Sequence, residues 1–431
     1  MSEASDNQNG WKSSVTGHIP VLDGLRGLAI LLVLFLHQTI MVEPQNPLDR
    51  SLDFLSHAGW SGVDLFFVLS GFLITGILFS SKGSQHYFRN FYMRRTLRIF
   101  PLYYAVVFLA LIVIPNIGTM LQQLPGGPPI EPELLQEKLD RFGRVEGREW
   151  YYWTYLSNFA IATHGFKHGI LDISWSLAIE EQFYLVWPIV VFLFKRETLM
   201  KLCVGIIVGA LAIRLAMIFV FDATPFATYV LTPARADSLA VGAWIALWAK
   251  GGGNLAKLAR RTSWFIPIGL LTIYATIVID DIFGWNERIP SAAKWCGYLV
   301  QTVGYSAAAI GFGALLVRTA AAPDRSLLAR FMLWKPMVVL GKYSYALYLF
   351  NLPIRALVRD LVMPPERWPL IAGSMVPMQI VFYAVSTLLT LFAAWVSWHL
   401  FEKQFLKLKK YFPASRPKRQ DGGWPEAERQ G

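Results

Sequence analysis

Residues 20–41 read PVLDGLRGLAILLVLFLHQTIM, and this stretch decides the class of protein that the chain forms. A helix needs about 20 predominantly apolar residues to cross the hydrocarbon core of a membrane, and this run has that length. The preceding nineteen residues are polar and lack the short apolar core and small-residue cleavage site of a secretory signal. We therefore interpret 20–41 as a retained transmembrane helix.

Apolar runs of similar length recur along the rest of the chain. We predict ten spans, at 20–41, 60–80, 99–119, 175–194, 202–221, 236–249, 263–280, 296–317, 336–360 and 371–400. The aromatic-rich stretch 150–162 is too short for an eleventh span, so we interpret it as interfacial or re-entrant. The predicted fold class is all-α, a polytopic membrane helix bundle with about ten transmembrane helices.

The composition favours the same class. Hydrophobic residues make up 54% of the chain and charged residues only 16%, whereas soluble domains carry about 25% charged residues. With the N-terminus inside, the predicted inside segments hold most of the 40 lysines and arginines, as expected for cytoplasmic loops. Both termini are then cytoplasmic, and the net charge of +11 requires no nucleic-acid partner.

The chain divides into three predicted parts. A polar cytoplasmic N-terminus covers 1–19, a membrane domain covers 20–402, and a basic tail covers 403–431. The composition of the tail predicts disorder. Cys203 and Cys296 both lie in apolar stretches, which disfavours a disulfide framework and a cysteine-based zinc site. No H-E-x-x-H pair, P-loop or G-x-S-x-G elbow occurs, so we expect no metal and no permanently bound cofactor.

Ionisable residues inside predicted spans are costly, and each is therefore a hypothesis about function. Arg26 and His37 are eleven positions apart in the first span, which puts them on one helix face about 16 Å apart along the axis. Asp23 is three residues before Arg26 and can neutralise it. The alternative is that Arg26 extends to one membrane surface and His37 is satisfied near the other.

Three arginines occur together in YMRRTLRIFP, residues 92–101. Arg95 and Arg98 are three positions apart, so on a helix they can grip one phosphate with Arg94 beside them. Positive charge at a cytoplasmic loop is the alternative explanation.

Carboxylates also interrupt apolar stretches. Glu180 lies in WSLAIEEQFYLVWP, residues 175–188, where a buried carboxylate needs a partner or a proton. Anchoring of a helix end is the alternative. Asp64, Arg235 and Asp237 lie toward the outer ends of their predicted spans, and an interfacial or ion-paired position explains each of them taken alone.

Small residues inside the spans indicate close helix packing, at Gly71, at Gly242 and from Gly341 to Ser344. Ser70, beside Gly71, is a candidate nucleophile that would need an activating base nearby.

Together these motifs resemble the acyltransferase 3 family of integral membrane O-acyltransferases, which decorate bacterial polysaccharides, lipopolysaccharide, peptidoglycan or secreted glycosides and macrolides. The matching motifs follow one another in the order of the family: LDGLRG with the spacing of Arg26 and His37, GVDLFFVLSGFLIT, RRTLRIFPLYY, WSLAIEEQFYLVWP, RADSLAVG and GKYSYALYLFNLPI.

The resemblance implies a location in the bacterial inner membrane, acyl-CoA (usually acetyl-CoA) as a co-substrate, and a glycan, glycolipid or glycoside acceptor. It also implies essential roles for Arg26, His37, Arg95, Arg98 and Glu180. Two departures occur. Asn351 stands where family members often have histidine, so we assign no acid–base role to that helix, and Glu402-Lys403-Gln404 stands where they commonly have Glu-x-Pro.

The resulting hypothesis divides the site across the membrane. Arg94, Arg95 and Arg98 hold the phosphates of coenzyme A, and Arg26 lies on the path of the donor. His37 takes the proton of the acceptor hydroxyl as general base, because imidazole titrates near neutral pH. Glu180 orients the imidazolium or the acceptor. Binding of the acceptor is assigned to Asp64, Arg235, Asp237 and Asn351, with Arg235 also a candidate to stabilise the oxyanion.

Three alternatives stay open from the sequence. The acyl group could pass through a covalent intermediate on Ser70 or Tyr345. The same intramembrane charges could line the path of a transporter or flippase for a glycolipid or small amphiphile. A membrane acyltransferase acting on lipid or protein is the third.

Overall fold

The computed structural model describes residues 20–41, 46–116, 145, 147–167, 169–283, 297–322 and 326–413. Within these residues all regular secondary structure is helical, and the one β-type pairing is an isolated bridge between Ile371 and Ser374. The all-α prediction is confirmed for the described part of the chain. Residues 1–19, Cys296 and most of the predicted tail lie outside the described residues.

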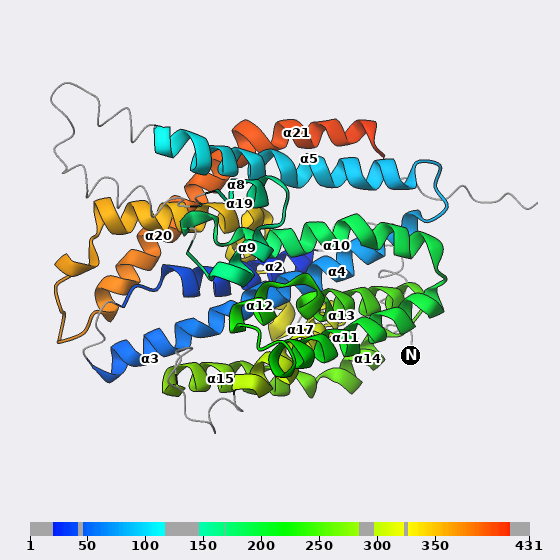
Figure 1. Ribbon diagram of the computed structural model, residues 1–431, viewed down its shortest axis with the longest axis horizontal. Helices are drawn as coiled ribbons and strands as arrows, with labels where there is room; N and C mark the ends of the chain where they lie inside the picture. Colours follow the sequence, from blue (N-terminus) through cyan, green and yellow to red (C-terminus); the bar gives the residue numbers. More distant parts are fainter. Residues whose placement is uncertain are drawn as a thin grey trace, which may run out of the picture.

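Most of the helices run roughly parallel to the long axis of the molecule (Figure 1). The long helices are α2 (Pro20–Gln38), α4 (Ser61–Ser81), α5 (Tyr87–Phe108), α10 (Ser174–Leu193), α11 (Arg196–Phe219), α13 (Thr232–Lys250), α15 (Phe265–Phe283), α17 (Tyr305–Ala320), α19 (Lys335–Leu357) and α20 (Val376–Ser397). Each of the ten predicted spans therefore overlaps one long helix.

Shorter helices connect them. These are α3 (Pro47–Ser56), η1 (His57–Trp60), η2 (Leu109–Val113), α8 (Glu149–Trp153), α9 (Ser157–His164), η3 (Gly169–Leu171), α12 (Pro225–Val230), α14 (Leu255–Thr262), η4 (Val300–Gly304), α18 (Leu327–Met332), η5 (Val358–Val362), η6 (Pro365–Arg367), η7 (Trp398–Glu402), α21 (Lys403–Lys407) and η8 (Leu408–Tyr411).

Local sequence sets several of these boundaries. Asn46 caps α3 by accepting hydrogen bonds from the backbone N–H groups of Leu48 and Asp49, and Thr224 caps α12 in the same way. Each cap is followed directly by proline, Pro47 or Pro225. Proline suits this position because its fixed φ fits the first helical turn and it has no N–H to leave unsatisfied.

Seven helical segments among the described residues are long and apolar enough to cross a membrane. They become eight if α14 and α15, which are bent by 47° at their junction, form one span. By length and apolar composition, the described residues therefore contain fewer membrane spans than the ten that were predicted. The helices that do not meet these criteria are α13 and α19, which contain Arg235, Asp237, Lys342 and Arg355 among their charged residues. The cytoplasmic placement of both termini stays a prediction.

The stretch 150–162 does not form one continuous helix. It is divided between α8 and α9, with Tyr155 in the break at a φ of 56°. The predicted disordered tail also begins within helical structure, since η7 continues into α21 and η8. This C-terminal helical segment packs along α5 (Figure 1).

Glycines allow two helix pairs to approach closely. A Cβ atom added at Gly341 of α19 would lie 1.8 Å from the backbone oxygen of Asp23 in α2. A Cβ atom at Gly71 of α4 would lie 1.9 Å from the backbone oxygen of Leu239 in α13. Any larger residue at either position would push the helices apart, so the predicted close packing at Gly71 and Gly341 is confirmed.

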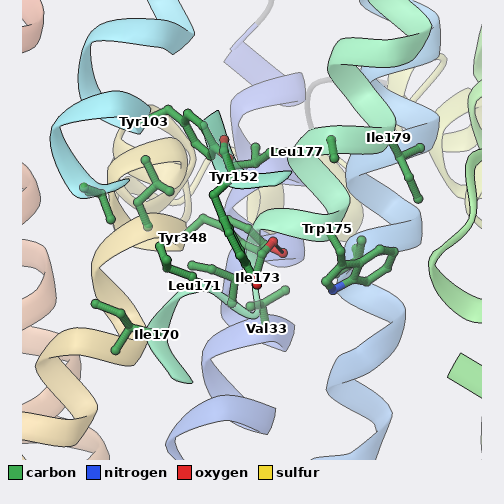
Figure 2. Close-up of a cluster of buried hydrophobic side chains, with 14 of the residues drawn as sticks. Val33, Tyr103, Tyr152, Ile170, Leu171, Ile173, Trp175, Leu177, Ile179 and Tyr348 are labelled. Carbon is green, nitrogen blue, oxygen red and sulfur yellow. Dashed lines mark hydrogen bonds between the residues drawn. The ribbon is translucent and has the colours of Figure 1, made fainter. Parts of the chain in front are cut away.

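The largest apolar core lies where α2, α5, α8, α10 and α19 meet (Figure 2). Val33, Tyr103, Tyr152, Trp175 and Tyr348 belong to it and are nearly inaccessible to solvent. The Tyr103 hydroxyl donates a hydrogen bond of 2.8 Å to the backbone oxygen of Tyr152. This core joins the first helix to α19, although 296 residues lie between the two helices in the sequence.

Candidate active site

His37 and Asn351 form the polar centre of the site at one end of α2. The Nδ1 atom of His37 lies 2.7 Å from Oδ1 of Asn351, a residue of α19 that is completely buried. The amide nitrogen of Asn351 donates a hydrogen bond to the backbone oxygen of Tyr348. A carbonyl oxygen only accepts, so the amide NH₂ must face Tyr348 and the amide oxygen must face His37.

This orientation fixes the protonation pattern of the imidazole. Because Oδ1 of Asn351 only accepts a hydrogen bond, Nδ1 of His37 must carry the proton. In the neutral ring Nε2 then keeps its lone pair. That nitrogen is the atom able to accept a proton from a substrate.

His37 lines a cavity of about 410 Å³, which we call the His37 cavity. Its walls are mostly aromatic and aliphatic. The lining residues are Val33, Leu36, His37, His57, Gly59, Trp60, Val63, Phe166, Asp172, Ile173, Trp175, Pro225, Phe226, Tyr229, Thr276, Ile277, Tyr305, Tyr348 and Leu352.

A second cavity, of about 100 Å³, gathers most of the predicted donor-site residues, and we call it the arginine cavity. It is lined by Arg26, Val63, Phe66, Phe67, Ser70, Arg95, Arg98, Ile99, Ser176, Leu177, Glu180, Tyr184, Ser344, Tyr345 and Tyr348. Two residues, Val63 and Tyr348, line both cavities. The guanidinium groups and the imidazole therefore face adjoining spaces inside the bundle.

Glu180 is held in the arginine cavity by a short chain of side chains. The hydroxyl of Ser70 donates a hydrogen bond to Glu180, and the Tyr184 hydroxyl donates one of 3.0 Å to Ser70. The guanidinium carbon of Arg95 lies 5.3 Å from the centroid of the Tyr184 ring. Ser70 thus has a carboxylate as its direct partner, which is the kind of base that a serine nucleophile requires.

The other two predicted basic residues, Arg26 and Arg94, differ in position: Arg26 lines the arginine cavity and Arg94 does not. Arg26 forms a 3.1 Å ion pair with Asp23, as the sequence spacing predicted, and still lines the arginine cavity. Arg94 does not line that cavity, and its guanidinium donates a hydrogen bond of 3.1 Å to the backbone oxygen of Phe412. Lys409, on the C-terminal helical segment, is close enough for electrostatic interaction with Arg94, Arg95 and Arg98.

Asp64, Arg235 and Asp237 line neither cavity. The Arg235 guanidinium makes a fully buried ion pair of 2.6 Å with Asp64. Asp237 is paired at 3.0 Å with Arg214 of α11.

Arg235 contacts two aromatic rings that line the His37 cavity. Its guanidinium carbon lies 4.9 Å from the ring centroid of Tyr229 and 4.3 Å from that of Tyr305, and both rings line the cavity. The charged groups therefore support the aromatic wall from behind.

Sequence reasoning missed several residues of the site. His57 and Trp60 belong to η1 and line the His37 cavity; His57 precedes the second predicted span, 60–80, and Trp60 is its first residue. Arg355 lies one helical turn beyond Asn351, and its charge acts on His37. Arg214 and Arg355 could have been found from the sequence, because each is an ionisable residue within an apolar helix. No motif marked Trp60.

Metal ligands do not gather in the described part of the chain: it holds no group of three or more histidine, cysteine or acidic side chains that could bind an ion.

The fold and site define a helical membrane protein with ionisable groups facing two adjoining internal cavities. A family model described as an acyltransferase domain, acyltransferase 3, matches residues 19–399. The chain belongs to this acyltransferase family.

Curated proteins that are similar in sequence are named as O-acetyltransferases. The peptidoglycan O-acetyltransferase OatA of Listeria monocytogenes is 28% identical over 370 residues, which cover 81% of this chain and 52% of the relative. The O-acetyltransferase OatA of Staphylococcus aureus is 27% identical over 400 residues, covering 90% and 57% respectively. The chain thus spans about half the length of these relatives. No solved structure matches it significantly.

Proposed function

We propose that this chain transfers an acyl group, in the first instance acetyl, from acyl-CoA to a hydroxyl of a carbohydrate-type acceptor at or across the bacterial inner membrane. The observation that carries the proposal is that the arginine cavity and the His37 cavity adjoin at Val63 and Tyr348. A cationic space suits a phosphorylated donor, and a neutral imidazole suits an alcohol that must lose its proton.

The donor enters through the arginine cavity. Arg95 and Arg98 bind phosphate oxygens of coenzyme A, because guanidinium matches phosphate with two parallel hydrogen bonds. Arg26 guides the pantetheine arm past Glu180 and toward Tyr348. The distance of about 16 Å along α2 from Arg26 to His37 then separates the charged part of the donor from its thioester.

His37 performs the chemistry at the far end of α2. Nε2 accepts the proton of the acceptor hydroxyl as its oxygen attacks the thioester carbonyl carbon. The tetrahedral oxyanion collapses, the carbon–sulfur bond breaks, and the imidazolium returns its proton to the leaving thiolate. The products are the ester and free coenzyme A.

Arg355, which like Arg235 lines neither cavity, is a second candidate to stabilise the oxyanion. Arg235 is paired with Asp64 behind the tyrosine rings, whereas Arg355 acts electrostatically on His37. Within the described residues Nε of Arg355 is buried and has no hydrogen-bond partner. A partly buried cation with a free donor is suited to charge that develops during the reaction.

The covalent route remains the mechanistic alternative, because Ser70 is hydrogen-bonded to Glu180 within the arginine cavity. Glu180 would take the Ser70 proton as the thioester acylates the serine. Rapid quenching with labelled acetyl-CoA, followed by digestion, distinguishes the routes. Label on the peptide that contains Ser70 or on the one that contains Tyr345 supports the relay, and its absence from both during active turnover supports direct attack.

The proposed function is tested with the purified chain in liposomes, labelled acetyl-CoA and a cell-envelope glycan fraction. We expect label on a glycan or glycolipid of this fraction, with a rate that falls about 10²- to 10⁴-fold in His37→Ala because the general base is lost. His399→Ala is the matched control, since that imidazole lines neither cavity and is hydrogen-bonded to the backbone oxygen of Trp395, one turn earlier. Movement of unmodified glycan without acyl-CoA would instead support a transporter.

A further inference from the structure

The His37 cavity has a composition that restricts what it can hold. Its volume of about 410 Å³ falls in the range of small-molecule sites, so it can enclose the reacting end of an acceptor and not the length of a glycan chain. Building on the proposed function, we propose that the acceptor is an amphiphile: a single hydroxyl-bearing head group that meets His37 and an apolar body that fills the rest of the cavity.

Aromatic side chains form a continuous wall around this space. Trp175 and Tyr229 have ring centroids 4.7 Å apart, and Tyr229 lies 6.3 Å from Trp60. Phe166 and Phe226 extend the wall, with their centroids 5.7 Å apart. Such rings offer a large apolar surface and few hydrogen-bond partners.

Several polar groups of the wall are already bound within the protein. The Tyr348 hydroxyl bonds to Ser176 and to the backbone oxygen of Ile173. The Thr276 hydroxyl donates to the backbone oxygen of Thr272, and Nδ1 of His37 is bound to Asn351. An oligosaccharide buried here would leave many hydroxyl groups without partners, which strongly opposes binding.

Trp60 supplies one free donor. Its indole N–H is buried and has no hydrogen-bond partner among the described residues. A buried tryptophan N–H usually has a partner, so this group is suited to an oxygen of the acceptor head group. The position of Trp60 is fixed, because a Cβ atom at the neighbouring Gly59 would lie 2.2 Å from the backbone oxygen of Leu32 in α2.

Part of the lining of the cavity comes from connecting segments. Phe166 follows α9, and Pro225 and Phe226 begin α12. An acceptor that arrives between these segments reaches His37 without passing the arginine cavity. This arrangement supports an acceptor, rather than the acyl chain of the donor, as the occupant.

The test uses n-alkyl glucosides from methyl to octyl, below their critical micelle concentrations, with acetyl-CoA and the whole chain in liposomes. We expect kcat/KM for the glucoside to rise about three- to fourfold per added methylene until the cavity is full. The glucoside concentration used for kcat/KM is the free aqueous one, so that partitioning into the bilayer does not enter the comparison. Phe226→Ala should flatten this dependence, whereas Phe392→Ala, an exposed residue on α20 that does not line the cavity, should leave it unchanged.

Trp60→Phe keeps the ring and removes the N–H. We expect KM for the glucoside to rise about tenfold while KM for acetyl-CoA stays the same. Equal kcat/KM for methyl and octyl glucosides would overturn the inference, and so would a preference for soluble oligosaccharides. If lengthening the acyl chain of the donor had the effect predicted for the acceptor, and Phe226→Ala abolished it, the cavity would belong to the donor.

A binding measurement separates this inference from the proposed function. Binding of each glucoside is followed by the fluorescence of Trp60 and Trp175, which line the cavity. Saturable binding that tightens with alkyl length, but without acetyl transfer, would retain the amphiphile site and refute the acyltransferase mechanism. Acetylation of a glycan with no binding of any alkyl glucoside would do the reverse.

Discussion

Oδ1 of Asn351 lies 2.7 Å from Nδ1 of His37, and 314 positions separate these two residues in the sequence. The amide cannot rotate to present its NH₂ group, because that group is already bound to the backbone oxygen of Tyr348. The asparagine therefore acts on the reaction through His37 and is a positioning residue.

Replacing Asn351 with leucine removes this control while keeping the volume of the side chain similar. We expect kcat to fall by at least about tenfold, but by less than in His37→Ala, because some of the imidazole still adopts the active tautomer. KM for acetyl-CoA should not change. Steady-state kinetics with both substrates varied checks this, and a wild-type kcat in Asn351→Leu would contradict the assignment.

The rate should increase with pH as His37 loses its proton, since only the neutral ring accepts a proton from the acceptor. In Asn351→Asp a carboxylate replaces the amide and favours the protonated imidazole. The acid limb of the kcat profile should therefore move to higher pH in this variant. Identical limbs in the variant and the wild type would mean that another group is the base.

Arg95→Ala and Arg98→Ala should each weaken coenzyme A binding about tenfold or more, because each removes a charge-assisted hydrogen bond to phosphate. KM for the acceptor should stay the same, since neither residue lines the His37 cavity. Isothermal titration with coenzyme A and with pantetheine checks the cause, as only the phosphorylated ligand should lose affinity. Arg260→Ala on the exposed side of α14 is the matched control.

Lys409 should contribute to the same binding. It is partly buried and interacts electrostatically with Arg94, Arg95 and Arg98, so its removal takes one cation from a cluster that would surround the phosphates. We expect Lys409→Ala to weaken coenzyme A binding about threefold to tenfold at low salt, and less at high salt because ions screen the charge. Lys410→Ala, an exposed neighbour, should have little effect.

The buried pair of Arg214 and Asp237 should matter for stability rather than for substrate binding. Arg214 also donates hydrogen bonds to Ser306 and to the backbone oxygens of Thr302 and Ala234. Arg214→Leu should destabilise the protein by about 3–5 kcal/mol, because it strands a buried carboxylate. Adding Asp237→Asn should recover part of that loss, and thermal unfolding in detergent measures both variants.

The hydropathy of the sequence predicted the positions of the long helices well, because a long apolar run can adopt few structures other than a helix. The run predicted at 60–80 is α4, Ser61–Ser81, and the run at 175–194 is α10, Ser174–Leu193. Helices α13 and α19 are not apolar enough to count as membrane spans, because they carry more charged residues. In α13, Asp237 is neutralised by an arginine on α11, a partner that lies on another helix.

The site was predicted less completely. Spacing within one helix correctly paired Arg26 with Asp23, since those residues are three apart. It gave no information on which helices meet, so neither the pairing of His37 with Asn351 nor that of Ser70 with Glu180 could be derived from one sequence. Asp64 and Arg235, assigned to acceptor binding, are paired with each other behind the wall of the His37 cavity.

The two cavities share only Val63 and Tyr348 among their lining residues, and this has a consequence for the cell that carries the protein. A wide, water-filled passage between the arginines and the imidazole would let protons leak across the bilayer and would dissipate the gradient that drives ATP synthesis. Val63 has no polar side-chain atom, and the Tyr348 hydroxyl is already hydrogen-bonded. A chain of water molecules between the cavities would therefore find few hydrogen-bond partners. We expect the protein to transfer an acyl group between the two cavities without letting protons cross the bilayer.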